Sequence, residues 1–225
     1  MFVSRSMARK VTTVDKATGL LEAQSLMQRL AIRHLPVVDA DNHLEGMITD
    51  RDIRSALPYE LAKGSGDQAQ REKYAYLKVS DAMSTDLLTI SPTHTLQDAL
   101  LLIEQKKVGA LPVVDEAGKL VGILSVRDLL RAFINVLGIG QPGTLLCIVV
   151  EEKIGQLKKI VDIITEENIS FGSVLVARYW EEGKRAVFPY LLSNNVVRVK
   201  KRLQEAGFTL VDPMQWYMDQ HPVED

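Results

Sequence analysis

The sequence has little of what a disulfide-bonded or membrane-spanning protein needs. It contains one cysteine, Cys147, among 225 residues, so no internal disulfide can form, as is usual in a reducing compartment. No segment approaches the roughly 18–20 consecutive apolar residues that cross a bilayer, and the longest apolar stretches, such as residues 145–150, have the length of a strand. The N-terminus lacks the apolar core of a secretory signal peptide. These absences predict a cytoplasmic protein without a membrane partner.

The chain also lacks a surplus of either charge. Its 27 lysines and arginines nearly balance its 29 aspartates and glutamates, for a formal net charge of -2. Nucleic-acid-binding domains concentrate basic residues on one surface. The densest basic cluster here, residues 198–202, falls on a predicted amphipathic helix, where it is best interpreted as a solvated face. We therefore expect no nucleic-acid partner.

Recognisable catalytic machinery is missing as well. The sequence has no glycine-rich phosphate loop of the P-loop or dinucleotide-binding type, and no nucleophile beside a candidate base. The histidines His34, His43, His94 and His221 do not have the spacing of metal ligands. Cys147 lies within an apolar strand and is expected to be a structural thiol. The sequence predicts neither an enzyme nor a metal site, and no required cofactor.

The chain does contain an internal sequence repeat. Residues 3–52 align with residues 79–128 without a gap, at a constant offset of 76 residues. The identical positions include the segment Leu-Pro-Val-Val-Asp at 35–39 and 111–115. Such a repeat indicates two copies of one supersecondary unit, each too small to bury its apolar face well alone. Two half-domains that pack together form clefts at their junction, and clefts hold ligands.

Each copy has the pattern of a β-α-β-β-α unit. Apolar residues three and four positions apart predict an amphipathic helix after the first strand, and turn-forming residues separate the second and third strands. The expected strands are residues 11–14, 35–38 and 44–48 in the first copy and 87–90, 111–114 and 120–124 in the second. A last helix is expected to begin at Thr49 and at Ser125. The fold class is therefore α/β (α+β) for this half of the chain.

A different pattern follows the glycine- and proline-rich segment 138–143. The order predicted there is β-α-β-β-α-β, the ferredoxin-like arrangement. Its elements are expected at residues 144–150, 155–165, 173–179, 186–192, 196–205 and 208–211. The predicted divisions are repeat 1–57, inter-repeat segment 58–78, repeat 79–135, linker 136–143, ferredoxin-like domain 144–212 and polar tail 213–225. Residues 68–77 could form a helix. The role of residues 58–78 is left open between a cleft lid and a dimer contact.

The best candidate site is the motif at the start of each repeat's last helix. It consists of Thr49, Arg51 and Asp52 in the first copy and of Ser125, Arg127 and Asp128 in the second. A helix N-terminus attracts phosphate, a hydroxyl can bond a phosphate oxygen, and a carboxylate can accept from both hydroxyls of a ribose. The same spacing is also that of a capping box, in which both side chains only close the helix end. Spacing alone does not separate a nucleotide site from a cap.

The two copies resemble cystathionine-β-synthase (CBS) domains arranged as a tandem pair, the Bateman module. The resemblance covers nearly all of residues 3–135 and rests on the Leu-Pro-Val-Val-Asp segments and on the two Gly-x-x-Thr/Ser-x-x-Asp motifs. It implies two clefts that bind AMP, ADP, ATP or S-adenosylmethionine. By this resemblance Asp52 and Asp128 would hold ribose, and Thr49 and Ser125 phosphate. Adenine would face backbone groups near Thr13, Thr89, Leu35 and Leu111.

The position before each Leu-Pro strand differs between the copies. His34 follows Arg33 in the first copy, whereas Ala110 follows Gly109 in the second. His34 could touch a phosphate in the adjacent cleft, or it could be a partly packed surface histidine, as most lone histidines are.

The C-terminal domain resembles ACT domains, which commonly bind amino acids at subunit interfaces. The loop at residues 151–157 is similar to the acidic-x-Pro-Gly-x-Leu turn of that family. The resemblance implies an effector loop at Glu152, Ile154 and Gly155, where glycine would let a ligand carboxylate approach the backbone. Ile154 stands in place of the usual proline, and a plain turn in a dimerisation domain is the alternative.

A CBS pair followed by one ACT domain is similar to the bacterial acetoin-utilisation accessory proteins. The sequence as a whole predicts a regulatory protein that binds an adenine nucleotide in the CBS pair, with an amino acid or small metabolite as a second effector. The resemblance also implies at least a homodimer and a regulated partner protein of unknown identity. The alternatives are a ligand-free scaffold and a nucleotide-processing enzyme.

Overall fold

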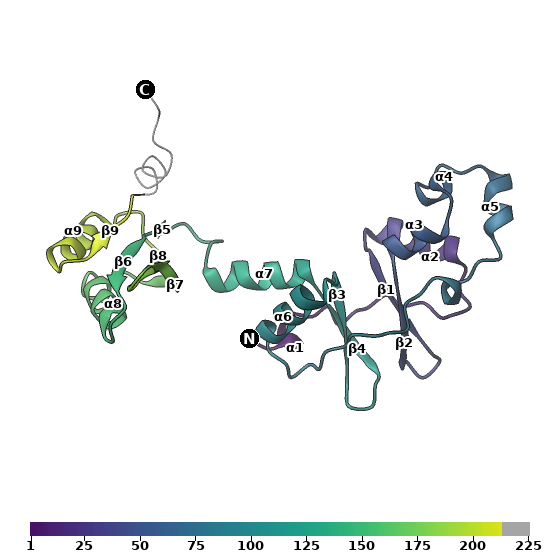
Figure 1. Ribbon diagram of the computed structural model, residues 1–225, viewed down its shortest axis with the longest axis horizontal. Helices are drawn as coiled ribbons and strands as arrows, with labels where there is room; N and C mark the ends of the chain where they lie inside the picture. The colour runs from purple at the N-terminus through teal and green to yellow at the C-terminus, as the bar shows by residue number, and fades with distance from the viewer. Residues whose placement is uncertain (213–225) are drawn as a thin grey trace, which may run out of the picture. The chain divides into compact units, whose positions relative to one another are not determined.

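The chain folds as two units, Met1–Leu130 and Arg131–Asp225 (Figure 1). The computed structural model describes residues 1–212, so the predicted tail 213–225, with Trp216, Tyr217 and His221, lies outside the described residues. Among the described helices, none has the length and apolar character of a membrane span. The boundary between the units falls within one helix, ahead of the linker predicted at residues 136–143.

Each repeat of the first unit is built on an antiparallel β-hairpin. The hairpins are β1 (His34–Val38) with β2 (Leu44–Thr49), and β3 (Ala110–Val114) with β4 (Leu120–Ser125). Both have the same register, and the register shifts at the same place, between the last two valines of the Leu-Pro-Val-Val segment. The predicted hairpins are thus confirmed, and the offset of 76 residues holds in the backbone geometry as well as in the sequence.

The strand expected at the start of each repeat is reduced to a single parallel bridge, of Val14 with Val37 and of Ile90 with Val113. The prediction of four-residue strands was therefore wrong in extent. Val14 donates its N–H to the Pro36 carbonyl and accepts from Val38. Extending this ladder by one step would need the N–H of Pro36, which proline lacks, and Pro112 has the same effect in the second repeat.

Helices pack against each hairpin (Figure 1). They are α2 (Leu20–Leu30) and α3 (Asp50–Ala56) in the first repeat, and α6 (Leu96–Lys106) and α7 (Val126–Leu137) in the second. The centres of the apolar stripes predicted from their periodicity are buried, with Leu20, Ala23, Leu96 and Ala99 at most 1% exposed. The prediction was wrong for Leu30 and Leu100, which are each 44% exposed. The helix α3 ends at Ala56 because Pro58 disfavours helical geometry at the preceding residue. The second repeat has no proline there, so α7 continues to Leu137.

The first residues of each repeat pack against the other repeat. The short helix α1 (Val3–Ser6) lies beside α6 (Figure 1), and Val3 donates its N–H to His94, 2.8 Å away. The equivalent turn η1 (Val79–Asp81) joins the first repeat, where Val79 donates to Thr18 at 2.9 Å. Both valines are fully buried. The repeats therefore exchange their N-terminal arms and share one structure.

The inter-repeat segment forms α4 (Tyr59–Ala62) and α5 (Gln68–Tyr74). The helix expected within residues 68–77 is thus confirmed as α5. Leu61 is 1% exposed in the core of the first repeat, and the Gln24 side chain donates to the carbonyls of Leu61 and Ala62 at 2.8 and 2.9 Å. The helix α4 is therefore anchored, whereas α5 has no buried residue.

Beyond α7, the described residues of the second unit, up to 212, form one antiparallel sheet and two helices. Its elements are β5 (Thr144–Leu145), β6 (Ile148–Glu151), α8 (Gln156–Glu166), β7 (Phe171–Glu181), β8 (Lys184–Leu191), α9 (Val197–Glu205) and β9 (Thr209–Leu210). The strand β8 pairs with β7 on one side and with β5 and β6 on the other, and β9 pairs with β6. The predicted strand 144–150 is interrupted between β5 and β6, but both parts keep one register with β8.

The basic cluster on α9 is paired with the end of α8. Arg202 bonds Glu166 and Glu167, and Arg198 pairs with Glu167 at 3.1 Å. Arg202 therefore has its pKa raised, first by Glu166 and then by Glu167. These ion pairs join the two helices, which agrees with the interpretation of the cluster as a helix face.

Candidate functional site

Both Thr/Ser-x-x-Asp motifs form complete capping boxes. Thr49 donates its N–H and its hydroxyl to Oδ2 of Asp52, at 2.9 and 2.7 Å, and accepts the Asp52 N–H at 3.3 Å. In the second repeat, Ser125 and Asp128 make the same three bonds at 2.9, 2.5 and 3.3 Å. The capping interpretation is therefore confirmed for both motifs.

The cap leaves part of the first motif available to a ligand. All three bonds use Oδ2 of Asp52, so the second carboxylate oxygen, Oδ1, has no partner among the described residues. Thr49 and Asp52 are both half-buried. A capping box fixes the direction of the carboxylate, and a fixed acceptor with one open oxygen suits a hydroxyl-bearing ligand. The cap and a ligand role are compatible.

The first motif lines a cavity of about 420 Å³ between the two repeats, which we name the first cleft. This volume is within the range of about 300–1,000 Å³ that is usual for small-molecule sites. The first repeat contributes Arg33, His34, Met47 and residues 49–52, and the second contributes Ser84, residues 86–88, residues 107–110 and Pro112. The lining thus combines the motif of one repeat with the strand-leading segments of the other.

The second motif lines a cavity of about 340 Å³, which we name the second cleft. Its lining consists of residues 31–34 from the first repeat and of Gly109, Ala110, Ile123, Ser125, Val126 and Arg127 from the second. Asp128 is half-buried and is not among the lining residues. The structure therefore brings Ser125 and Arg127 to this cleft, but not the carboxylate that the sequence places with them.

The two clefts share a wall formed by Arg33, His34, Gly109 and Ala110. The His34 ring lies against Gly109, where an added Cβ would come within 2.8 Å of Nε2. Glycine at this position makes room for the imidazole.

Burial lowers the pKa of His34 below its ordinary value of 6.5. Asp50 opposes this effect, the charge of Arg33 adds to it, and Asp52 opposes it more weakly. Because the net shift is downward, His34 is neutral at pH 7.

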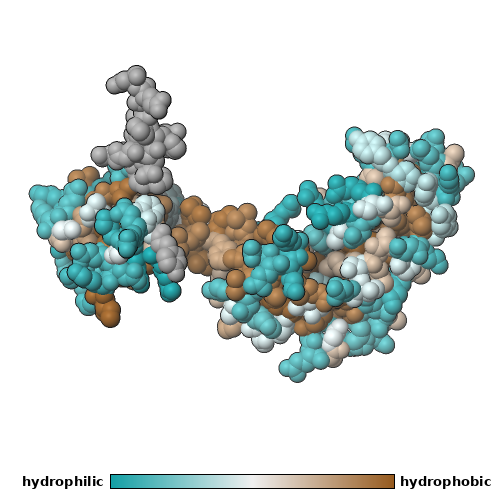
Figure 2. Space-filling view, in the orientation of Figure 1, coloured by the Kyte–Doolittle hydropathy of each residue, from teal (hydrophilic) through white to brown (hydrophobic). Residues whose placement is uncertain are grey.

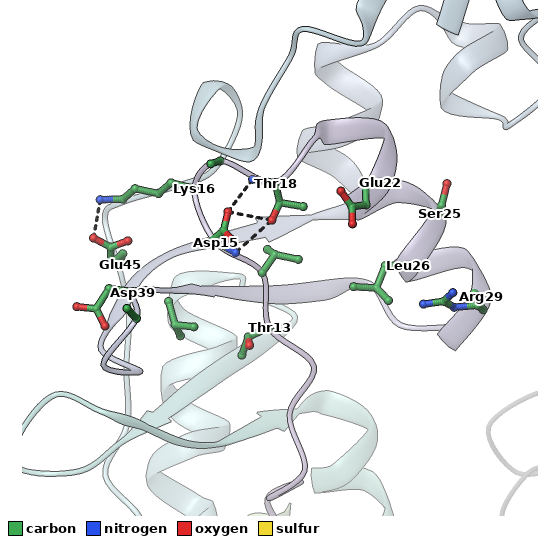
Figure 3. A pocket seen from close by; sticks show the side chains of 14 residues that line it. Thr13, Asp15, Lys16, Thr18, Glu22, Ser25, Leu26, Arg29, Asp39 and Glu45 are labelled. Carbon is green, nitrogen blue, oxygen red and sulfur yellow. Dashed lines mark hydrogen bonds and ion pairs between the residues drawn. The ribbon is translucent and has the colours of Figure 1, made fainter.

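The residues expected near adenine are distributed differently. Leu35 and Leu111 are fully buried in the cores of their repeats and line neither cleft. Thr89 lines neither cleft, although the preceding residues 86–88 line the first. Thr13 lies in another cavity, shown in Figure 3. The sequence did not predict residues 86–88 and Lys107 as cleft-lining residues, because only the packing of the repeats brings them to the first motif.

The cavity that contains Thr13 has a volume of about 760 Å³ and lies within the first repeat alone. Two groups of its polar side chains bond within the cavity: Lys16 bonds Glu45 at 2.7 Å, and Asp15 accepts from Thr18 (Figure 3). This is the arrangement of a solvated surface hollow.

One carboxylate and imidazole cluster among the described residues has ligand atoms within 4.8 Å of one another, at Asp39, Asp41 and His43. Asp39 accepts from the backbone N–H groups of Asp41 and His43 and bonds the His43 ring at 3.2 Å. These bonds, led by the His43 backbone bond, hold the pKa of Asp39 below its usual range. The cluster is the turn of a hairpin.

The loop expected to bind an effector joins β6 to α8. Glu152 donates its N–H to Gly183 at 3.0 Å and pairs with Arg185, which anchors the loop to the β7–β8 turn. Gly155 has a φ of +93°, a conformation that favours glycine, and precedes α8 without a side-chain cap. Ile154 is fully exposed.

The family model of the CBS domain matches residues 3–59 and 79–135, just over half of the chain. The chain belongs to the CBS domain family. The two matched segments coincide with the two hairpin repeats and their helices, so the two clefts lie between the two domains of a CBS pair.

Similar pairs occur alone and within enzymes. A CBS domain-containing protein of Dictyostelium discoideum is 34% identical over 137 residues, which are 61% of this chain and 94% of that protein. The inosine-5'-monophosphate dehydrogenase of Bifidobacterium longum is 35% identical over 133 residues, 57% of this chain but only 22% of the enzyme. The chain thus spans about a fifth of the length of that enzyme.

Two solved structures share the fold of the first unit. A protein assigned to acetoin utilization (AcuB) from Vibrio cholerae superposes with a TM-score of 0.52 at 29% identity, over 62% of this chain and 95% of that one. CBSX2 of Arabidopsis thaliana, solved in complex with AMP, superposes with a TM-score of 0.50 at 28% identity, over 59% of this chain and 96% of that one.

Proposed function

We propose that this protein is a regulatory sensor of an adenine nucleotide, which binds in the first cleft between the CBS domains. One observation carries the proposal: the Thr49–Asp52 motif, with an open carboxylate oxygen, lines a cavity of about 420 Å³ together with apolar and basic residues of the other repeat. The AMP complex of the similar CBSX2 fold supports it.

Each part of a nucleotide has a matching surface in the first cleft. Oδ1 of Asp52 can accept from a ribose hydroxyl. The start of α3 offers backbone N–H groups to a phosphate, although that helix has only seven residues, and Arg51 and Lys107 supply positive charge. Leu87 and Val108 offer apolar contact to the adenine ring.

The charge of the first cleft favours a monophosphate. Its cationic side chains are Arg33, Arg51 and Lys107, and its carboxylates are Asp50, Asp52 and Asp86. Three charges of each sign leave little excess for the additional charge of a triphosphate. AMP is therefore the nucleotide we expect to bind best, ahead of ADP, ATP and S-adenosylmethionine.

Regulation follows from where the ligand binds. A ligand that contacts both repeats stabilises their packed arrangement, and a partner protein that prefers this arrangement is coupled to the ligand. The start of α3, which the first motif caps, lines the first cleft, so a bound ligand acts directly on this helix.

For the second unit we propose a ferredoxin-like domain of the ACT type. The element order β-α-β-β-α-β and the antiparallel order β9, β6, β8, β7 support it. The effector would be an amino acid whose carboxylate lies at the loop of Glu152, Ile154 and Gly155.

We also propose that the protein is a homodimer. The helix α7 exposes Val126, Leu130 and Ile134 on one stripe, four residues apart, and Figure 2 shows apolar surface over this helix. Exposed apolar stripes of this kind mark interfaces.

The test is calorimetric titration with AMP, ADP, ATP and S-adenosylmethionine. The Asp52→Asn/Asp128→Asn double variant keeps one side-chain oxygen for each cap but loses the second acceptor, so we expect AMP affinity to fall at least about tenfold. The matched control is Asp98→Asn. Asp98 forms the same capping box with Thr95, at 2.9, 2.7 and 3.1 Å, and lines neither cleft.

The outcomes separate the three kinds of protein. A sensor binds AMP, and only the double variant loses it. A scaffold gives no saturable binding while remaining folded, which contradicts the proposal. An enzyme converts the nucleotide in the absence of a partner, which chromatography of the titrated mixture detects.

A further inference from the structure

The wall between the two clefts contains one cation, Arg33, and one neutral imidazole, His34, for two sites. Arg33, His34, Gly109 and Ala110 each line both the first and the second cleft. They are equivalent pairs in the repeat, since Arg33 corresponds to Gly109 and His34 to Ala110. The first repeat therefore supplies both large polar side chains, and the second supplies the space for them.

The contact at Gly109 shows that this asymmetry is fixed by packing. A Cβ on Gly109 would lie 2.8 Å from Nε2 and 2.9 Å from Cε1 of His34. Real Cβ atoms do not approach so closely, so a larger residue at 109 requires the imidazole to move. A large side chain at position 109 therefore cannot lie beside His34 unless the imidazole moves.

We propose that the two clefts compete for Arg33 and His34, so that a phosphate-bearing ligand in one cleft weakens the binding of a second in the other. This inference rests on the proposed function and adds a regulation to it. A bound AMP phosphate carries about -1.5 to -2 charges at pH 7. The second phosphate would find the Arg33 guanidinium already paired and a like charge nearby.

The competition has a direction. Outside the shared wall, the first cleft contains Arg51 and Lys107, whereas the second contains only Arg127. The first cleft also has the Asp52 carboxylate in its lining, and the second lacks Asp128. The first cleft is therefore filled first, and the second binds in a weaker step.

The test compares AMP titrations of the wild type with those of the single-cleft variants Asp52→Asn and Arg127→Ala, because Arg127 lines the second cleft but not the first. We expect the wild type to show two steps at least about tenfold apart, as for an ordinary coupling between sites. Arg127→Ala keeps the tight step. Asp52→Asn weakens binding in the first cleft, so the second cleft then binds AMP more tightly than in the second step of the wild type. A wild type that binds one AMP, with the second site emerging only in Asp52→Asn, is the extreme case and also supports the proposal.

A second experiment combines His34→Ala with each single-cleft variant in turn. Because His34 lines both clefts, we expect the substitution to lower the AMP affinity of either cleft, although His34 belongs to the first repeat. The matched control is His43→Ala, a half-exposed histidine of the same repeat that lines neither cleft. Adenosine, which has no phosphate, should bind both clefts without the weakening.

Three results overturn the proposal. In the first, the wild-type isotherm equals the sum of the two single-cleft isotherms, which leaves the sensor function intact. In the second, adenosine also weakens the binding of a second adenosine, which would show that the effect is steric and does not depend on the phosphate. If the wild type does not bind AMP at all, the proposed function fails together with the competition.

Discussion

Among single residues, Asp52 combines a capping role with a place in a cavity. It uses Oδ2 to close α3 and lines the first cleft. The sequence identified the motif but could not divide its two roles, because the spacing is the same for both. Only the coordinates show which oxygen is used.

We expect Thr49→Ala and Thr95→Ala to lower the free energy of unfolding by similar amounts, about 1 kcal/mol each, because each removes an equivalent cap. Urea denaturation measures this. Only Thr49→Ala should also weaken AMP, because Thr95 lines neither cleft. Equal loss of AMP affinity in both variants would mean that the effect comes from stability alone.

His34 predicts a pH dependence of stability. Its pKa in the folded protein lies below 6.5, so the unfolded chain binds the proton more readily. The contribution of His34 is complete above pH 6.5 and declines as the pH falls below that value, by at most about 1.4 kcal/mol per pH unit. Asp50, Asp52 and Arg33 are the charged groups that act on it.

Chemical denaturation of wild type and His34→Gln between pH 8 and pH 5 gives this contribution as a difference, because other groups titrate in both proteins. We expect the glutamine variant to lose less stability toward low pH. Parallel curves would show that His34 has the same pKa in both states.

At the scale of elements, the hairpins and most helices were predictable because periodicity and turn residues are local signals. The leading strands were not, because Pro36 and Pro112 remove the N–H groups that the ladder needs from the partner strand. The helix α1 was missed because four residues carry no periodicity. The cleft lining at residues 86–88 was missed because it depends on how two repeats pack.

The helix α4 is anchored by one fully buried side chain, Leu61, in addition to the Gln24 hydrogen bonds. We expect Leu61→Ala to lower the free energy of unfolding by about 2–5 kcal/mol, because this leucine is buried in the core of the first repeat. Tyr59→Ala, two residues away and 67% exposed, should change it by less than about 0.5 kcal/mol. Thermal unfolding of both variants checks the difference. Similar losses would indicate that α4 is held by its exposed side.

At the scale of the whole first unit, the exchange of N-terminal arms predicts crossed effects. We expect Val3→Ala to loosen the second repeat, since it removes part of a fully buried side chain from the arm whose backbone bonds His94 and Ile123. Val79→Ala should loosen the first, through Thr18. Amide hydrogen exchange, read peptide by peptide, measures the pattern. Loss of protection confined to the mutated repeat itself would contradict the exchange.

The exchanged arms also impose an order on synthesis. Residues 1–8 are made before their partners, which lie between His94 and Ile123, about a hundred residues later. The first repeat in turn waits for residues 77–84 before its own edge is closed. The nascent chain therefore carries the apolar side chains of Val3 and Met7 without their partners until the second repeat has been made. A chaperone that recognises exposed apolar side chains would find a binding site in this arm during that interval.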